Sequence, residues 1–194
     1  MVLDDEALDT LFRNARTHDE FADEPVTDEQ LRAIYELAKL GPTSANSSPG
    51  RFYVIRTPEA KEKLRPCLSL GNIDKTMAAP VTIVVAYDPY FHNKLLDLYP
   101  AVDIKSWFSG NPDLLEETCL RNSALQGAYF LLAARGLGLV CGPMSGFDRT
   151  KLDRTVLATQ GWKSNFLINL GHPKGEELPP RLPRLSFEQA VAFA

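Results

Sequence analysis

The stretch VTDEQLRAIYELAKLGPTSANSSPGRFYVIR, from Val26 to Arg56, reads in order as a helix, a long loop and a strand. Thr27 and Gln30 have the spacing of a capping box, which marks the start of a helix. The apolar residues that follow form a stripe with helical spacing, made of Leu31, Ile34, Leu37 and Ala38. Gly41 and Pro42 end the helix, and the β-rich run 51–56 predicts a strand.

The loop between helix and strand is unusually long and unusually polar. Residues 41–50 are almost all small or polar, and no charge occurs before Arg51. A turn needs only two or three such residues. We therefore expect this loop to have a function beyond connecting two elements.

Length and composition indicate one ordinary globular domain. The chain has 194 residues, 44% hydrophobic and 24% charged, which suits a single domain over residues 1–194. Twenty-one basic against 25 acidic residues give a net charge of −4, with no long basic run, so we expect neither a nucleic-acid nor a membrane partner. The apolar runs fall short of the ~20 residues that span a bilayer. No signal peptide is read, and a cytoplasmic protein is expected.

The cysteines and histidines do not predict a metal site. Cys67, Cys119 and Cys141 are widely spaced without a CxxC pair, and the three histidines lie far from one another in the sequence. We expect three reduced thiols and no metal.

The remaining pattern predicts helices around a sheet of about four strands. Helices are expected from Asp4 to about Arg16, after Pro58, from Pro112 to about Leu137 and after Asp148, with a short one at the end of the chain. The continuous apolar run 80–87 predicts a strand buried on both faces. Two further strands are expected, in GLVCGPM and NFLINLG, which gives an α+β or α/β domain.

Three familiar catalytic or nucleotide-binding patterns are not supported. The glycines at 136, 138 and 142 are spaced one residue too far apart for a dinucleotide fingerprint and follow a helix, so they predict a helix end and a turn. Ser145 lacks the flanking pattern of a nucleophile elbow. Cys141 has no motif that pairs it with a histidine and is expected to be a buried structural thiol.

Four polar clusters carry the functional signal instead. They are Arg13–Arg16, the loop 41–50, Gly71–Lys75 and Pro180–Arg184. Arginines suit a phosphate dianion, which they bind in bidentate geometry. Hydroxyl, amide and free backbone groups suit a planar heterocycle with several donors and acceptors.

In their order along the chain, these motifs resemble the FMN-dependent nitroreductase family. The resemblance rests on FADEPVTDEQLRAIYELAKLGPTSANSSPGRFYVI, on Asn72 to Lys75 followed by APVTIV, on AARGLGLVCGPMSGFD and on RLPRLSFEQAV. The loop and GPMSGFD are similar to the HadB/RutE-like branch, which includes malonic semialdehyde reductases. The resemblance implies an α+β nitroreductase-like fold: a mostly antiparallel sheet of four to five strands, surrounded by helices, in an intertwined homodimer.

The resemblance also implies a set of residues that bind FMN at the interface between two subunits. Near the phosphate and ribityl chain it places Arg13, Asn14, Ala15 and Arg184, with Arg181 as a weaker candidate and the choice between Arg16 and Thr17 left open. Around the flavin ring it places Pro42, Thr43, Ser44 and Asn46 of the partner subunit, Asn72 and Lys75 at the pyrimidine edge, and Pro143, Met144, Ser145 and Gly146. A cation at the pyrimidine edge stabilises the negative charge of the reduced ring.

Two departures from the family pattern bear on the substrate. The loop lacks the glutamine and tryptophan of many relatives, and Ser145 stands where some nitroreductases have a glutamate. The resemblance implies a ping-pong cycle in which NADH or NADPH reduces the flavin. The electron acceptor is then a small electrophile: malonic semialdehyde, giving 3-hydroxypropionate, or a nitro compound or quinone.

The sequence assigns no side chain an obligatory catalytic role. Thr43 and Ser145 are candidate proton donors, Arg51 is a candidate for binding a substrate carboxylate, and the aromatic stretch 90–108 is a candidate lid. Two alternatives stay open: a flavin-binding module with little reductase turnover, and a different enzyme on the same fold, such as a flavin-fragmenting or dehalogenating type.

Overall fold

The centre of the molecule is a four-stranded antiparallel sheet. The computed structural model describes residues 2–108, 110–175 and 180–194. The strands are β1 (Gly50–Ile55), β2 (Val81–Tyr87), β3 (Val140–Met144) and β4 (Lys163–Gly171), in the order β1-β2-β4-β3. Every neighbouring pair is antiparallel. The expected α+β fold with a mostly antiparallel sheet is therefore confirmed.

Helices surround this sheet. The longer ones are α2 (Asp28–Ala38), α3 (Pro58–Leu64), α4 (Leu70–Ala78), α6 (Pro112–Gly136) and α7 (Arg149–Thr155). The shorter ones are α1 (Asp5–Leu8), α5 (Leu95–Leu98) and α8 (Phe187–Ala190). The first helix is shorter than expected: α1 passes into a π-helical turn, η1 (Asp9–Arg13), and then ends. Single 3₁₀ turns are η2 (Ser44–Asn46), η3 (Arg65–Cys67), η4 (Phe91–Lys94) and η5 (Lys105–Phe108).

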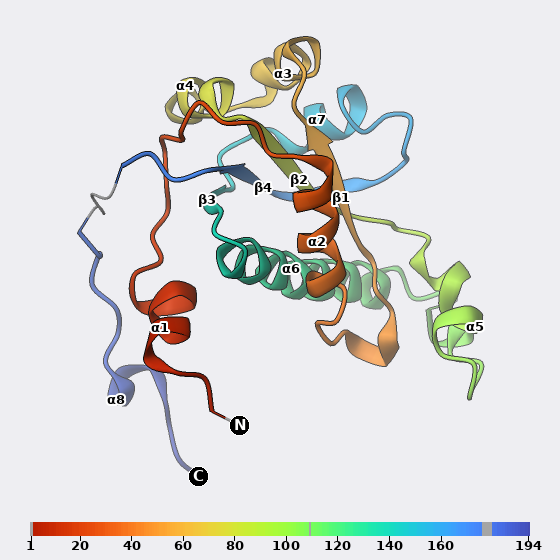
Figure 1. The fold of residues 1–194 in the computed structure, drawn as a ribbon. Coiled ribbons are helices and arrows are strands. Elements are labelled where there is room, and N and C mark those ends of the chain that lie inside the picture. The colour runs from red at the N-terminus through yellow and green to blue at the C-terminus, as the bar shows by residue number, and fades with distance from the viewer. Residues whose placement is uncertain (1, 109, 176–179) are drawn as a thin grey trace.

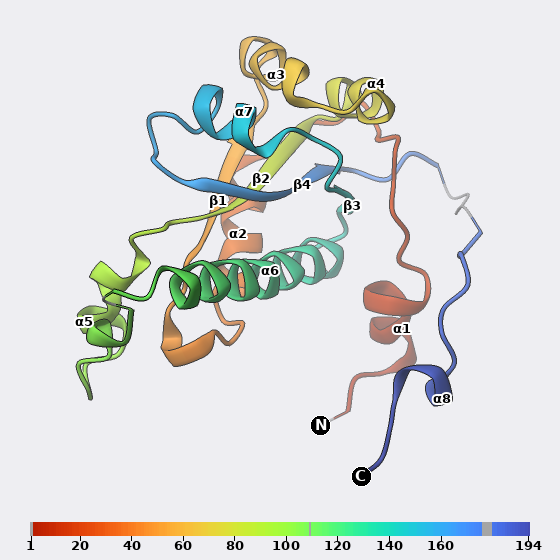
Figure 2. The ribbon, with the colours of Figure 1, turned by 180° about the vertical axis from the view of Figure 1, so that it is seen from behind.

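The helices form two layers, one on each face of the sheet. Figures 1 and 2 show α2 and α6 on one face and α3, α4 and α7 on the other. Because side chains alternate along a strand, Ile83 and Val85 of β2 join the core under α2 and α6, whereas Val84 and Ala86 join the core under α3 and α7. Both faces are covered, which explains why β2 is apolar at nearly every position.

Helix α2 begins as its sequence predicts. The Gln30 amide donates to the Thr27 hydroxyl, and the Thr27 amide donates to the Gln30 side chain, so both halves of the capping box are present. Ile34 and Ala38 are buried against the sheet. The expectation for Leu37 is wrong: its side chain is 47% exposed, because the sheet covers only the part of the stripe that faces it.

Helix α6 is capped by Asn111 and runs for 25 residues along the sheet. It buries Phe130, Ala133 and Ala134 in the core. On another face of the same helix, Leu125 is 43% and Tyr129 is 38% exposed. The expected central helix is thus confirmed, and a second face of it leaves two large apolar side chains partly exposed.

Residues 88–108 pack as a separate apolar cluster beyond the end of the sheet. Phe91 and Phe108 meet edge to face, with ring centroids 5.0 Å apart, and Leu95 and Ile104 are buried with them. Tyr90 and Trp107 stay exposed. Cys119 of α6 belongs to the same cluster, so this segment is held against α6, with two aromatic rings left at its surface.

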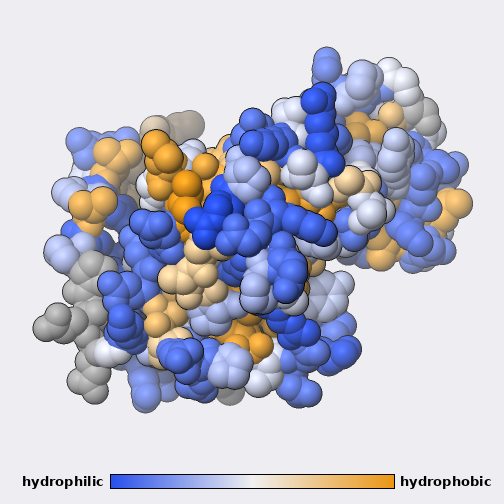
Figure 3. All heavy atoms as spheres, turned by 90° about the horizontal axis from the view of Figure 1, so that it is seen from above, coloured by the Kyte–Doolittle hydropathy of each residue, from blue (hydrophilic) through white to orange (hydrophobic). Residues whose placement is uncertain are grey.

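The two ends of the chain extend away from the sheet on one side. Figures 1 and 2 show α1 and α8 there, with Phe187 and Phe193 of the tail largely exposed. The face above the sheet is mainly hydrophilic, with apolar residues in small groups (Figure 3). Within the described ranges, no helix is long and apolar enough to cross a membrane.

Candidate functional site

The segment after η1 runs directly against strand β3. Thr17 forms a parallel bridge with Cys141, and the His18 amide donates to the Cys141 carbonyl at 3.0 Å. A Cβ atom on Gly142 would lie 2.3 Å from the His18 carbonyl oxygen. Only a glycine allows this approach, so residues 16–19 follow the sheet edge toward the end of β3.

An arginine-lined cavity of about 690 Å³ lies at the start of this segment. Its cationic walls come from Arg16, Arg135, Arg181 and Arg184, and Ala15 and Thr17 also line it. Arg181 donates to the carbonyls of Phe12, Arg13 and Ala15 at 2.7–3.0 Å, which ties the C-terminal tail to the end of η1. Desolvation, and then the charges of Arg16, Arg184 and Arg135, lower the pKa of Arg181. Such a cluster of like charges is a site for an anion.

The neighbouring arginine of the same motif lies outside that cavity. Both Asp5 and Asp9 accept hydrogen bonds from the Arg13 guanidinium at 2.9 Å, and these bonds raise the pKa of Arg13. Asn14 lines a second, smaller cavity beside His18 and Cys141. Of the residues expected near a phosphate, the structure brings together Ala15, Arg181 and Arg184, adds both Arg16 and Thr17, and turns Arg13 away.

A second group of polar residues gathers where β3 ends. Asn72 of α4 donates to the Gly146 carbonyl at 2.9 Å, and the Ser69 amide donates to the same oxygen at 3.0 Å. Lys75 Nζ lies 3.1 Å from Asp19 Oδ1. Thr76 donates to the Met144 sulfur at 3.5 Å. Helix α4, residues 144–146 and Asp19 therefore meet at one place, which brings Asn72, Lys75, Met144 and Gly146 together.

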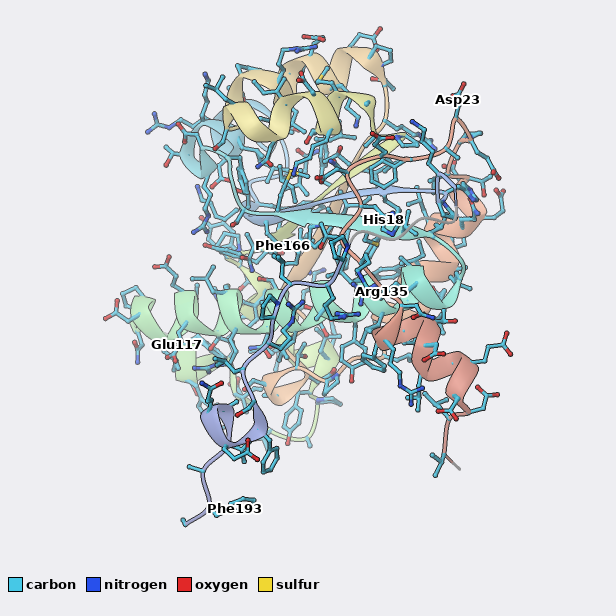
Figure 4. All side chains as sticks on the ribbon, turned by 90° about the vertical axis from the view of Figure 1, so that its left-hand side faces the viewer. His18, Asp23, Glu117, Arg135, Phe166 and Phe193 are labelled. Carbon is cyan, nitrogen blue, oxygen red and sulfur yellow. The ribbon has the colours of Figure 1, made fainter. Side chains whose placement is uncertain are left out.

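Residues 16–19 join the two groups. Arg16 and Thr17 line the cationic cavity, whereas Asp19 reaches Lys75 at the other end. His18 lies between them, near Arg135 (Figure 4). Burial, and then the Arg135 charge, lower the pKa of His18, so its imidazole is neutral at neutral pH. The segment 16–19 thus leads from the arginines along the edge of β3 to Lys75, past a smaller cavity that is partly lined by Leu139 and Val140.

The loop that begins at Pro42 is held in a strained conformation. Ala45, Asn46 and Ser48 have φ angles of +49°, +50° and +41°. The left-handed region is unfavourable for residues other than glycine and persists where surrounding contacts enforce it. Those contacts are present: the Ser44 amide donates to Asn122, the Ser48 amide donates to Thr43 Oγ1, and Asn46 donates to the Leu98 carbonyl. These hydrogen bonds hold the loop in one conformation.

This loop is remote from the arginine cavity within one chain. Ser44 is bonded to Asn122 in the first half of α6, whereas Arg135 of the cationic cavity lies thirteen positions later on the same helix. At a rise of 1.5 Å per residue, those two points are about 20 Å apart. One copy of the chain therefore does not bring the loop to the arginine cavity.

Two candidate reactive side chains are occupied or inert. Arg51 donates to Asp88 at 2.9 Å and to the carbonyls of Ser48 and Gly50. Burial raises the pKa of Cys141 to about 12, so it is the structural thiol that its sequence predicts. Ser145, next to Gly146, is exposed, which keeps its hydroxyl accessible.

Signals for His18, Asp19 and Lys61 are weaker in the sequence. His18 and Asp19 follow the first arginine cluster, but only the pairing with β3 shows which of these residues face the sheet edge. Lys61 occupies the buried face of α3, three residues before Leu64. A lysine at a core position of an amphipathic helix is the signal that identifies it.

The chain is similar to known proteins over nearly its whole length. The model of the "Nitroreductase family" matches residues 12–172. The "Putative NADH dehydrogenase/NAD(P)H nitroreductase" of Stutzerimonas stutzeri strain A1501 is 54% identical over 192 residues, 99% of this chain and 98% of that protein.

Two solved structures share the fold. The "nitroreductase family protein" from Streptococcus pneumoniae TIGR4 has a TM-score of 0.83 at 22% identity, over 95% of this chain and 98% of that one. The "putative nitroreductase in complex with FMN" from Exiguobacterium sibiricum 255-15 has a TM-score of 0.85 at 19% identity, over 100% of this chain and 99% of that one. The match of the family model and the identity to the Stutzerimonas protein show that the chain belongs to the nitroreductase family.

Proposed function

We propose that FMN binds along residues 16–19, from the arginine cavity to Lys75. The protein uses the bound FMN to pass electrons from a nicotinamide cofactor to a small electrophile. The enzyme class follows from the family: the chain is an FMN-dependent NAD(P)H oxidoreductase. The observation that supports the location is the path of residues 16–19, which has clustered cations at one end and amide and ammonium groups at the other.

The residues at the two ends fit the two ends of FMN. Arg16, Arg181 and Arg184, with Thr17 beside them, would hold the phosphate, because their mutual repulsion is relieved by a dianion. We assign Arg13 a different role: its ion pairs with Asp5 and Asp9 stabilise α1 and η1. Asn14 and Ala15 remain candidates for the ribityl chain.

At the ring end, Asn72 and Lys75 of α4 would lie at the pyrimidine edge, and residues 143–146 along the ring. FMN, when bound, supplies the hydride-transfer chemistry, and the protein supplies orientation and charge. Lys75 keeps a cation at the edge where negative charge develops, and Asp19 fixes the position of its ammonium group. Asn72 is held by the Gly146 carbonyl, so α4 and the end of β3 form one rigid wall.

The proposed site needs a second copy of the chain. The strained loop with Pro42, Thr43, Ser44 and Asn46 would close over the ring from the partner of a homodimer. Two observations support this: the distance of about 20 Å along α6 within one chain, and the uncovered apolar surfaces at Leu125, Tyr129 and the C-terminal tail.

Malonic semialdehyde is the acceptor that we propose first, with quinones and nitroaromatics as alternatives. Its reduction needs a proton for the developing alkoxide, and Thr43 and Ser145 are the hydroxyls placed to supply it or to orient a water. Thr43 Oγ1 accepts from the Ser48 amide, so its proton is available for donation. Binding of the substrate carboxylate by Arg51 would require the Arg51–Asp88 pair to open.

Reoxidation of the reduced protein distinguishes these acceptors. The FMN-loaded protein is reduced anaerobically with one equivalent of NADH and mixed with malonic semialdehyde, a quinone or a nitroaromatic. We expect malonic semialdehyde to restore the oxidised spectrum fastest and to yield 3-hydroxypropionate. Recovery with quinones or nitroaromatics alone would keep the enzyme class and reject the semialdehyde.

A further inference from the structure

A lysine is buried behind the proposed ring site without a counter-ion. The Lys61 side chain belongs to α3, and the residue is only 4% exposed. Among the described residues, no carboxylate lies within ion-pair distance of it, and burial lowers its pKa to about 8. A buried, unpaired ammonium group is costly, so its retention calls for an explanation.

All three donors of this ammonium group are used, and two of them hold helix α4. Lys61 Nζ donates to the carbonyls of Thr76 at 2.6 Å and Ala79 at 2.9 Å, which lie at the C-terminal end of α4. A cation at this end also complements the helix dipole. The lysine therefore fixes the helix that carries Asn72 and Lys75.

The third donor starts a chain of buried hydrogen bonds. Lys61 donates to Thr82 at 2.8 Å, and Thr82 donates to Asn169 Oδ1 at 2.8 Å. Asn169 donates to Thr76 at 3.3 Å, and Thr76 donates to Met144. The polar members Thr76, Thr82 and Asn169 are fully buried, so each bond limits the movement of the next. The chain ends one residue before Ser145, on the strand that would lie along the ring.

We propose that Lys61 is a positioning residue for the flavin site: it fixes the end of α4 and, through Thr82, Asn169 and Thr76, the end of β3. The two walls of the proposed ring site are thus fastened to one ammonium group. This inference rests on the proposed function. Loss of Lys61 would loosen both walls, and the reduced flavin, whose charge is stabilised by Lys75, would lose more affinity than the oxidised form.

The test compares Lys61→Met with Lys63→Met, which removes an exposed lysine from the same helix. FMN is titrated into each apoprotein by fluorescence quenching, and the midpoint potential of bound FMN gives the affinity ratio of the reduced and oxidised forms. We expect Lys61→Met to raise the Kd of oxidised FMN about tenfold, and that of reduced FMN by a further severalfold. We expect Lys63→Met to match the wild type.

Equal Kd and equal potential in both variants, with only a lower melting temperature for Lys61→Met, would overturn the proposal. If Lys61→Met does not fold, Thr82→Val decides, because it cuts the link to Asn169 and leaves both helix carbonyls bonded. A severalfold rise in Kd with a lower potential supports the proposal, and unchanged values reject it. Failure of the wild type itself to bind FMN would instead reject the proposed function.

Discussion

Gly142 lies so close to His18 that a Cβ atom at position 142 would stand 2.3 Å from the His18 carbonyl oxygen. The atom that such a Cβ would strike belongs to the main chain of His18. That main chain cannot easily move away, because the His18 amide is hydrogen-bonded to the Cys141 carbonyl. This approach lets residues 16–19 follow the edge of β3 and connect the arginine cavity with Lys75. The proposed site therefore depends on a glycine at position 142.

We expect Gly142→Ala to destabilise the protein by about 1–3 kcal/mol, the usual cost of overpacking, and to weaken FMN binding. Chemical denaturation and FMN titration measure the two effects. Gly71→Ala is the control for stability alone: no atom lies within 4 Å of a Cβ there, and α4 gains a better helix former. Equal stability of Gly142→Ala and the wild type would show that the segment moves aside without cost.

Arg13 ends η1 and Arg16 lies three residues later, and we expect the two arginines to behave differently. Arg16→Ala removes a cation from the cavity and should weaken FMN binding about 10- to 150-fold, since a hydrogen bond to a charged group contributes about 1.5–3 kcal/mol. Arg13→Ala removes exposed ion pairs with Asp5 and Asp9 and should change the Kd less than threefold. Isothermal titration measures the Kd for FMN of both variants. A larger rise in Kd for Arg13→Ala than for Arg16→Ala would show that Arg13 belongs to the phosphate site.

Lys61 should give the stability of the protein a specific pH dependence. Its pKa is about 8 in the folded chain, below the ordinary value of 10.5. Between these values the unfolded chain binds more protons than the folded one, so the free energy of unfolding rises with pH across this window. The contribution is about 3 kcal/mol when complete.

Urea denaturation of the wild type and of Lys61→Met between pH 7 and 10.5 isolates this contribution. The difference in unfolding free energy between the two proteins should change steadily in favour of the wild type as pH rises. A difference that is constant across the window would mean that Lys61 keeps an ordinary pKa.

The uncovered face of α6 predicts association of two chains. Leu125→Glu places a charge on this face and should convert a dimer into a monomer, with loss of FMN affinity because the partner's loop is removed. Light scattering after size exclusion measures the mass. Val54→Glu, at a similarly exposed residue of β1, is the control and should stay dimeric. A monomeric wild type that binds FMN tightly would contradict the two-chain site.

The sequence predicted those parts of the fold that depend on local chemistry. The capping box at Thr27, the buried strand around Val84 and the start of α6 at Asn111 are each encoded within a few residues, and all three were found. The half-exposed position of Leu37 was not predicted, because helical spacing does not show how much of an apolar stripe the neighbouring elements bury.

The site was predicted less completely, because its contacts join distant residues. Spacing left the choice between Arg16 and Thr17 open, and the resemblance named Arg13 for the phosphate. Which of these residues line the cavity depends on where η1 ends and on the bridge of Thr17 to Cys141. Lys61 escaped notice because its acceptors lie 15 to 21 residues further along the chain. Such relationships are visible only once the strands are paired.

The most direct test of the central claim is the absorption spectrum of the FMN-titrated protein before and after anaerobic addition of NADH. We expect one bound FMN per chain, with an absorption spectrum that bleaches rapidly as NADH reduces the bound flavin. No binding of FMN would contradict the assignment of the arginine cavity and of Asn72 and Lys75. Tight binding without bleaching by NADH or NADPH would leave a flavin-binding module and contradict the reductase.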